Sequence, residues 1–406
     1  MLPWFPCSVR PFLNNVFRGG FSCSLKCTPH MRCASRFKSV TTVSQAVGHY
    51  GSVGKWLVGL SAMTFGAVVL GGATRLTESG LSMVDWHPFK EAPPSSEEQW
   101  IAEFNKYKQF PEYQYHVQQH GEMSLSRFKF IWYMEYTHRM WGRMIGAMFA
   151  LPGAYFWYKG YFSSRMKPRF LIYGGLLGFQ GLLGWLMVRS GLKEPQPPVG
   201  HKPDEPFSGV PRVGHFWLSA HLVSAVVLYS LFLWGSMDHL AKHPPCSDNQ
   251  GTRVLCPQYE IKAYQTKGCA FVAGLDAGLV YNSWPKMADR WIPTDLFSPQ
   301  YGSALSNLVN NPTGVQFVHR VLAYSTVAVA TALWVSVMRV GVARTGPRIR
   351  NAAHLVLAAV WGQSALGVLT LLHYVPVSLG VMHQAGSLVL FSTLLWFTHC
   401  LRAVPK

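Results

Sequence analysis

The stretch Glu135-Tyr-Thr-His138-Arg139 lies in a long apolar segment, and the similar stretch Gln316-Phe-Val-His319-Arg320 lies in another apolar segment of the second half of the chain. Each stretch is followed by a further histidine, and a tryptophan stands thirteen residues after it: His221 with Trp234, and His383 with Trp396. Matches that keep their order along both halves indicate an internal duplication.

The duplication extends beyond the histidines. Glu78-Ser-Gly-Leu81 matches Asp276-Ala-Gly-Leu279, and Gln180 with Gly184 matches Gln363 with Gly367. Each half then forms a unit of four helices, and the two units are parallel because four is an even number. We expect an N-terminal repeat at residues 47–242 and a C-terminal repeat at residues 243–406.

The composition predicts a membrane protein. Of the 406 residues, 49% are hydrophobic and 13% are charged, about half the charge of a typical soluble protein. A bilayer core requires about 20 apolar residues per helix. Seven segments meet this criterion: 56–74, 129–156, 170–188, 215–236, 315–338, 353–375 and 378–398. We therefore predict an all-α membrane protein, an eight-helix bundle of two parallel four-helix repeats.

The fifth helix of this bundle is atypical. Only Cys269 to Leu275 is cleanly apolar there, and the preceding segment 250–268 contains Glu260, Lys262 and Lys267. Either this helix is short and distorted, or the segment is a variant or faulty reading of the gene that damages the second half. An even number of crossings nevertheless requires a helix at this place.

Loop charges predict the orientation. The net charge of +18 would suggest a nucleic-acid partner in a soluble chain, but here the basic residues lie in the leader and in short loops, so we expect no nucleic acid. The loops around Lys159–Arg169 and Arg339–Arg350 contain no acidic residue, whereas the loop from Glu78 to Arg127 contains several glutamates. The basic loops and both termini should face the matrix or cytoplasm.

The N-terminus has the composition of an organelle transit peptide. The first 77 residues contain no Asp or Glu, and basic residues are scattered among Ser, Phe and Leu. We assign residues 1–46 to a mitochondrial transit peptide and predict a multi-pass protein of the inner membrane. The alternative is a basic tail that stays in place.

The four histidines predict heme sites. All four lie in the first third of an even-numbered helix, so they reach a similar depth, near the face opposite the basic loops. Histidine is an axial ligand of heme iron, and two histidines on facing helices suit one heme. The chain has no Cys-x-x-Cys-His motif, so any heme is held by coordination and packing. For a single histidine in a membrane, the alternative is a hydrogen-bonded packing residue.

The two halves differ where Glu135 is replaced by Gln316. Each residue lies one helical turn before its histidine, and Arg139 can pair with Glu135. A carboxylate in a membrane is costly unless it is paired or functional. We interpret Glu135 as a proton acceptor beside a reactive heme; the alternative is an ion pair that only orders the helix. Arg139 and Arg320 are candidate partners of heme propionates, with interfacial placement as their alternative role.

These motifs resemble the heme A synthase family over nearly everything from Lys55 to Pro405. The residues that carry the resemblance are Gly71-Gly-Ala-Thr-Arg75-Leu-Thr-Glu-Ser-Gly80-Leu, the two histidine-arginine stretches, Ala273-Gly-Leu-Asp-Ala-Gly-Leu279 and His383-Gln. With the leader, the chain resembles the animal mitochondrial form.

The resemblance implies an oxidoreductase. It implies that heme b is bound through His319 and His383, and that heme O is the substrate between His138 and His221. Glu135 would be the catalytic residue that helps convert the C8 methyl of heme O to a formyl group by successive hydroxylations, giving heme A for cytochrome c oxidase. The expected partners are heme O synthase, an electron-transfer partner and inner-membrane lipid, with a homo-oligomer left open. The heme sites would lie towards the intermembrane space.

Two other function classes remain open at the level of sequence. A diheme b-type membrane electron carrier would use the same four ligands without modifying heme. A transporter or a non-catalytic assembly factor would use the histidines for packing alone.

Overall fold

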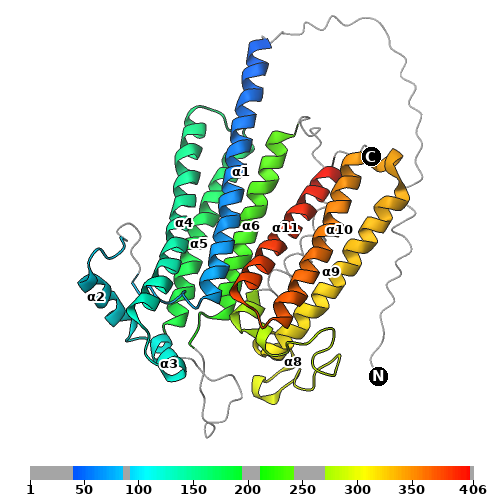
Figure 1. The fold of residues 1–406 in the computed structure, drawn as a ribbon. Coiled ribbons are helices and arrows are strands. Elements are labelled where there is room, and N and C mark those ends of the chain that lie inside the picture. The colour runs from blue at the N-terminus through cyan, green and yellow to red at the C-terminus, as the bar shows by residue number, and fades with distance from the viewer. Residues whose placement is uncertain (1–39, 86–91, 194–210, 242–269, 403–406) are drawn as a thin grey trace, which may run out of the picture. The chain divides into compact units, whose positions relative to one another are not determined.

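The computed structural model describes residues 40–85, 92–193, 211–241 and 270–402, with side chains from residue 51 onward (Figure 1). Residues 45–406 belong to one compact unit. Its described part is helical and contains no β-strand. The all-α prediction is therefore confirmed, whereas the arrangement as two four-helix repeats stays a prediction.

Seven long helices make up most of this unit (Figure 1). They are α1 (Val40–Leu76), α4 (Leu125–Tyr158), α5 (Met166–Gly191), α6 (His215–Leu240), α9 (Pro312–Val340), α10 (Val342–Leu372) and α11 (Val377–Leu401). Shorter elements lie in the connections: α2 (Glu97–Tyr107), α3 (Pro111–His120), α8 (Ala304–Asn310) and the 3-10 turns η1 (Ala277–Leu279) and η2 (Pro299–Tyr301).

Six helices in the described part of the chain are long and apolar enough to cross a membrane. They are α1 from Gly51 onward, α5, α6, α9, α10 and α11. Helix α4 is long enough, but Glu135, Arg139 and Arg143 interrupt its apolar sequence. Its membrane crossing stays a prediction, as does that of the fifth helix, because segment 250–268 lies outside the described residues. The chain is helical at 270–274.

The predicted leader is mostly outside the described residues. Residues 1–39 are not described, and α1 begins at Val40, inside the predicted range of 1–46. The end of a transit peptide is set by a processing enzyme rather than by helix formation. The overlap with α1 therefore does not test the predicted end at residue 46, which stays a prediction.

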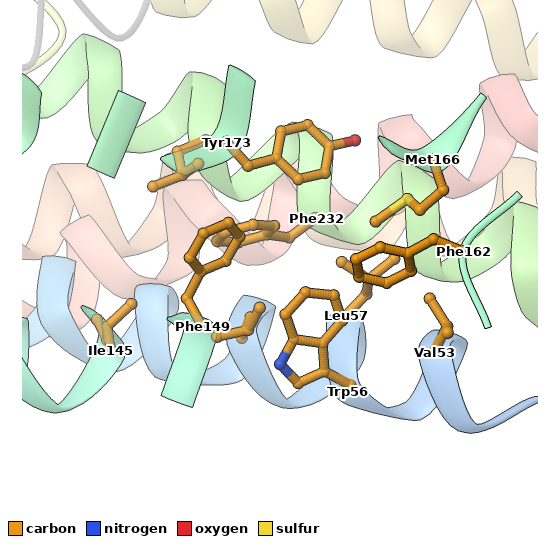
Figure 2. Close-up of a cluster of buried hydrophobic side chains, with 11 residues drawn as sticks. Val53, Trp56, Leu57, Ile145, Phe149, Phe162, Met166, Tyr173 and Phe232 are labelled. Atoms are coloured by element: carbon orange, nitrogen blue, oxygen red, sulfur yellow. The ribbon is translucent and has the colours of Figure 1, made fainter. Parts of the chain in front are cut away.

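Each half has its own hydrophobic core. The core of the first half joins α1, α4, α5 and α6 (Figure 2); Trp56 stacks on Phe149 with ring centroids 5.8 Å apart, and Phe149 stacks on Phe170 at 4.7 Å. The core of the second half joins α9, α10 and α11 around Val356 and Val360. Helix α10 packs on both α9 and α11, so the two helices that carry His319 and His383 both lie against α10.

Helices α6 and α11 contact each other between the halves. A small cluster of Val68, Tyr229 and Leu388 fills this junction, and the Tyr229 hydroxyl lies 2.6 Å from the Ser392 hydroxyl. The residues that the duplication aligns, Tyr229-Ser230 and Phe391-Ser392, therefore meet at one place.

The first and last helices of the bundle also pack across the halves through a small residue. A Cβ at Gly380 would lie 2.7 Å from Leu76 Cδ1. On the other side, a Cβ at Gly274 would lie 3.6 Å from Leu218 Cδ2. Leu76 aligns with Gly274 in the duplication, and Gly380 aligns with Leu218. The two contacts are therefore equivalent, with the large and small partners exchanged.

The long loop after α1 contains structure that the sequence pattern did not reveal. Helices α2 and α3 pack on the start of α4 through an aromatic cluster in which Phe128 and Tyr107 are almost fully buried. Trp100 contacts Trp132 edge to face, with ring centroids 5.1 Å apart. This cluster fixes the loop beside the turn of α4 that carries Glu135.

Candidate functional site

Glu135 is buried and fully hydrogen-bonded. Only 3% of the residue is exposed. Its Oε1 accepts from Arg139 Nη2 at 2.6 Å, and its Oε2 accepts from the Ser82 hydroxyl and the Met83 backbone N–H, both at 2.8 Å. A buried carboxylate is stable only with such partners. The loop after α1 and the next turn of α4 together therefore hold this carboxyl group at a fixed place.

Gln316 occupies the equivalent position without that charge. Its Nε2 donates to the Tyr281 backbone oxygen at 3.1 Å, and its Oε1 is buried with no partner among the described residues. Tyr281 stands five residues after Asp276, as Met83 stands five residues after Glu78. The two halves thus use the same loop position in opposite ways, with a backbone donor for Glu135 and a backbone acceptor for Gln316.

Arg139 and Arg320 each hold the loop of their own half by hydrogen bonds to its backbone. Arg139 donates to the backbone oxygens of Met83 at 2.7 Å and Asp85 at 3.0 Å. Arg320 donates to the backbone oxygens of Tyr281 at 2.9 Å and Lys286 at 3.3 Å. Each arginine therefore anchors the loop before its own helix, a role that the sequence alone did not indicate.

The four histidines line one cavity of about 2030 Å³. Single-ligand pockets are typically about 300–1,000 Å³, so this cavity has room for more than one ligand. Its lining is mostly apolar and glycine-rich, and the charged residues that reach it are Arg75, Glu78, Glu135, Arg139, Arg143, Asp276, Arg320 and Arg339. The duplicated segments thus meet at a shared apolar space.

Glycines make room for three of the four imidazole rings. A Cβ at Gly71 would lie 3.0 Å from His138 Cε1. At the aligned positions Gly184 and Gly367, a Cβ would lie 3.5 Å from His221 Cε1 and 2.8 Å from His383 Cε1. In the second half, the rings of His319 and His383 lie edge to face, with centroids 6.3 Å apart and planes at 77°.

Histidines without a counterpart in the other half are engaged elsewhere. His215 Nε2 lies 3.0 Å from Asn310 Oδ1, and His354 Nδ1 accepts from Trp334 Nε1 at 3.1 Å. His373 Nδ1 lies 2.9 Å from the Leu369 backbone oxygen. These contacts give each ring a packing role.

Asp276 connects the two halves at the rim of the cavity. It forms ion pairs with Arg75 at 3.0 Å and with Arg212. Asp276 and its counterpart Glu78 both adopt left-handed backbone conformations, with φ of 48° and 53°. Both residues therefore end their segments in the same turn, and within the described part of the chain Asp276 is the one that pairs with arginines of the opposite half.

The chain matches the family model described as cytochrome oxidase assembly protein, COX15-CtaA, over residues 54–395. The matched range contains both histidine pairs, both loop clamps and the whole cavity. The chain belongs to this family. Membership in the COX15-CtaA family confirms the resemblance that the motifs carried.

Curated members of the COX15-CtaA family are similar over most of their length. The chain is 50% identical to heme A synthase COX15 of Bos taurus and 49% identical to that of Homo sapiens, in each case over 87% of this chain and 83% of the relative. It is 37% identical to heme A synthase COX15 of Saccharomyces cerevisiae over 86% of this chain and 75% of the relative. No solved structure matches the chain.

Proposed function

We propose that this protein is a heme A synthase, which oxidises the C8 methyl of heme O to a formyl group by successive hydroxylations. The observation that carries the proposal is the buried, three-donor site of Glu135 one helical turn from His138, in a family whose curated relatives are named heme A synthase. The proposed product is heme A for cytochrome c oxidase.

The geometry of the second half fits a heme b. The ring centroids of His319 and His383 are 6.3 Å apart. A metal ion held between two imidazoles would have bonds of about 2 Å to each ring nitrogen. When the distance from each nitrogen to its ring centre is added, the expected separation of the centroids is close to the observed one. We therefore propose that His319 and His383 would hold heme b. Bound heme would supply one-electron redox chemistry.

His138 and His221 are the proposed ligands of the substrate heme O. Both line the cavity, and both rings pack on glycines that allow a flat macrocycle to approach. The cavity continues from this pair to His319 and His383. The two proposed heme sites would thus open onto one cavity.

Glu135 is the proposed catalytic residue. Its carboxylate can accept a proton from the substrate side when one of its three hydrogen bonds breaks. The amide of Gln316 cannot act as a proton acceptor in this way. Arg139 pairs with Oε1 and so orients this carboxylate. Arg139 and Arg320 hold loop carbonyls, and each is also a proposed partner of a heme propionate.

The proposed architecture is an eight-helix bundle of two parallel repeats. The exchanged contacts of Leu76 with Gly380 and Leu218 with Gly274, and the matching left-handed turns, support it.

We further propose that the protein lies in the mitochondrial inner membrane, with both termini in the matrix and the heme sites towards the intermembrane space. The transit peptide, residues 1–46, and the partner heme O synthase belong to this proposal. None of the comparisons favours a diheme electron carrier.

The decisive experiment replaces Glu135 in cells that lack their own heme A synthase. With Glu135→Gln, which gives the first half the amide of the second, we expect heme O to accumulate and heme A to disappear in extracted pigments. The matched control is Glu98→Gln, which changes an exposed carboxylate of α2 and should leave heme A normal. Normal heme A with Glu135→Gln, at equal protein level, would refute the assignment of Glu135.

A further inference from the structure

A tight turn in the second half carries two adjacent apolar side chains that are largely exposed. Met287 and Arg290 exchange backbone hydrogen bonds, from Met287 N–H to the Arg290 oxygen at 2.9 Å and from Arg290 N–H to the Met287 oxygen at 3.3 Å. The Met287 side chain is buried, whereas Trp291 and Ile292 are 61% and 63% exposed. The corresponding connection of the first half, by contrast, buries its aromatic side chains in the cluster around Phe128.

Hydrogen bonds hold this turn against the flank of α9. The Tyr324 hydroxyl donates to the Pro285 backbone oxygen at 3.4 Å, and Arg320 Nη1 donates to the Lys286 backbone oxygen at 3.3 Å. Arg320 and Tyr324 stand eight and twelve residues after Pro312, the first residue of α9, and so lie in its third and fourth turns. The turn therefore lies beside the helix and not beyond its end.

The turn covers a face of α9 that points away from the central cavity. Phe317 and Val321 lie one helical turn apart on this face, and together with the two exposed side chains they line a hollow of about 240 Å³. Neither of them is among the residues that line the central cavity, and Val329, two turns further along the same face, is 60% exposed. This face of a helix that is apolar enough to cross a membrane therefore points outward.

The length of α9 sets the depth of the turn. Its 29 residues span about 43 Å at about 1.5 Å per residue, and the hydrocarbon core of a bilayer is about 30 Å thick. If the excess of about 13 Å is shared between both ends, the core begins near Gln316; if all of it lies at the N-terminal end, the core begins near Val321. Because Trp291 and Ile292 share a hollow with Val321, they lie at or inside the boundary of the hydrocarbon core.

The backbone of the turn is satisfied in the way that an apolar environment requires. The Ser283 hydroxyl donates to the Lys286 backbone oxygen at 2.9 Å and accepts from the Ala288 backbone N–H at 2.8 Å. With the bonds from α9 and the exchanged bonds of the turn, every backbone oxygen from Pro285 to Met287 has a donor within the protein. Water supplies such partners to a loop in solution, but irregular backbone within a bilayer must be satisfied by protein groups.

Charged side chains stand where the turn would meet phospholipid headgroups. Lys286 and Arg290 are both exposed, and the acidic residue Asp289 lies between them. Tryptophan and basic residues are typical of the boundary between headgroups and hydrocarbon, and a net positive charge favours anionic lipid. The hollow of about 240 Å³ is smaller than typical small-molecule pockets of about 300–1,000 Å³, so it suits a segment of an acyl chain.

We propose that the Met287–Arg290 turn, with Trp291 and Ile292, is an interfacial anchor that inserts into the bilayer leaflet at the start of α9, so that lipid acyl chains cover this surface. The basic side chains of the turn then contact headgroup phosphates. The anchor also bears on the C-terminal half, because Arg320 is bonded to this segment. The proposal does not depend on the oxidation of heme O: a chain without that activity would still insert this turn.

Photolabelling from lipid tests the proposal on the unmodified full-length protein. The protein is placed at one copy per nanodisc with a phospholipid that carries a diazirine in its acyl chain, and labelled residues are identified by mass spectrometry. We expect adducts on Trp291 and Ile292 as well as on Val329, the exposed residue of α9 that serves as the internal positive control. Gln118 and Gln119, exposed polar residues of α3, should stay unlabelled.

This arrangement separates lipid from other partners of the surface. One copy per nanodisc excludes a second copy of the chain as the cover, and purified protein excludes a partner protein. Adducts on Val329 without adducts on Trp291 or Ile292 would overturn the proposal. Strong labelling of Trp291 and Ile292 by a water-soluble diazirine would overturn it as well, because the turn would then face water.

A variant tests whether the two side chains hold the turn at the membrane. Trp291→Ser combined with Ile292→Ser removes the apolar surface but none of the hydrogen bonds of the turn. In nanodiscs we expect faster hydrogen exchange of the Met287 and Arg290 amides and weaker photolabelling of the turn. Asp289→Ser, at an exposed position of the same turn, is the matched control and should keep both at the original level. Equal exchange in the two variants, with Val329 still labelled from lipid, would refute the anchoring role.

Discussion

The side-chain amide of Gln384 lies directly on Gly72, and its Nε2 donates to the Val68 backbone oxygen at 3.1 Å. Gln384 follows His383, and Gly72 follows Gly71, the glycine on which the His138 ring packs. Helix α1 thus contacts the proposed ligand His138 of the first half and the residue next to the proposed ligand His383 of the second half. Any shift of α1 at this point is transmitted to both sites.

Gly72→Ala should therefore destabilise the protein. A Cβ at this position overlaps Gln384 Oε1, and overpacking of this kind costs about 1–3 kcal/mol. We expect a lower unfolding temperature in detergent, measured by intrinsic fluorescence, and partial recovery when Gln384→Ala is added. Gly59→Ala, on an open face of the same helix, should be neutral or stabilise by up to about 1 kcal/mol. Equal effects of the two alanines would contradict the contact.

The buried ion pair predicts a difference between the two arginine clamps. Arg139→Leu leaves the Glu135 carboxylate buried beside an apolar side chain, which costs about 3–5 kcal/mol. Arg320→Leu removes hydrogen bonds to the loop backbone and to Tyr324, with no carboxylate among the described partners, at about 1–3 kcal/mol. Thermal unfolding should rank Arg139→Leu as the more damaging change. Adding Glu135→Gln to Arg139→Leu should recover stability, because no charge is then left unpaired; no recovery would argue against the pair.

The histidine assignments predict which substitutions remove the resident heme. His383→Ala and His319→Ala should each abolish the bis-histidine spectrum of the purified protein, because one axial ligand is missing. His221→Ala should leave that spectrum in place. His354→Ala, an exposed histidine bonded to Trp334, is the control. An unchanged bis-histidine spectrum in His319→Ala and His383→Ala would exclude heme ligation by His319 and His383.

The sequence alone revealed those parts of the site that repeat within short distances along the chain. The spacing of Glu135 to His138 and the match of Gln180 to Gln363 could be recognised because each motif lies on one helix. The ion pair of Arg75 with Asp276 joins residues 201 positions apart, and no local pattern predicts such a pair.

Other features depend on which groups face each other in space. The hydrogen bond from Gln180 Nε2 to the Ser224 hydroxyl could not be predicted, because a sequence match says nothing about side-chain direction. Helices α2 and α3 were missed because their short sequences are mostly polar, and tertiary contacts of Trp100 and Tyr107 with α4 decide their place. Helix α4 shows the converse case: Glu135, Arg139 and Arg143 weaken its apolar signal, although its contacts place it in the helical core of the first half.

Glu112 predicts a pH dependence in the loop helices outside the spans. Burial, with weaker contributions from Glu135 and Glu78, raises the pKa of Glu112 from 4.5 to about 8, although the Tyr107 hydroxyl, which donates to Glu112 Oε2 at 3.1 Å, acts to lower it. The folded protein therefore holds this proton more tightly than the unfolded chain. Between about pH 5 and pH 8, its stability should fall as the pH rises, because the unfolded state has already lost the proton in this range.

Glu112→Gln removes this titration and keeps an oxygen that can accept from Tyr107. We expect the variant to show a flatter dependence of unfolding temperature on pH between about 5 and 8, and to be more stable than the unmodified protein at pH 8, where the carboxylate of Glu112 carries the desolvation cost. Glu98→Gln, in the exposed first turn of α2, should keep the original slope. A slope that survives in Glu112→Gln would assign the pH dependence to another group and leave Glu112 ionised in the folded protein.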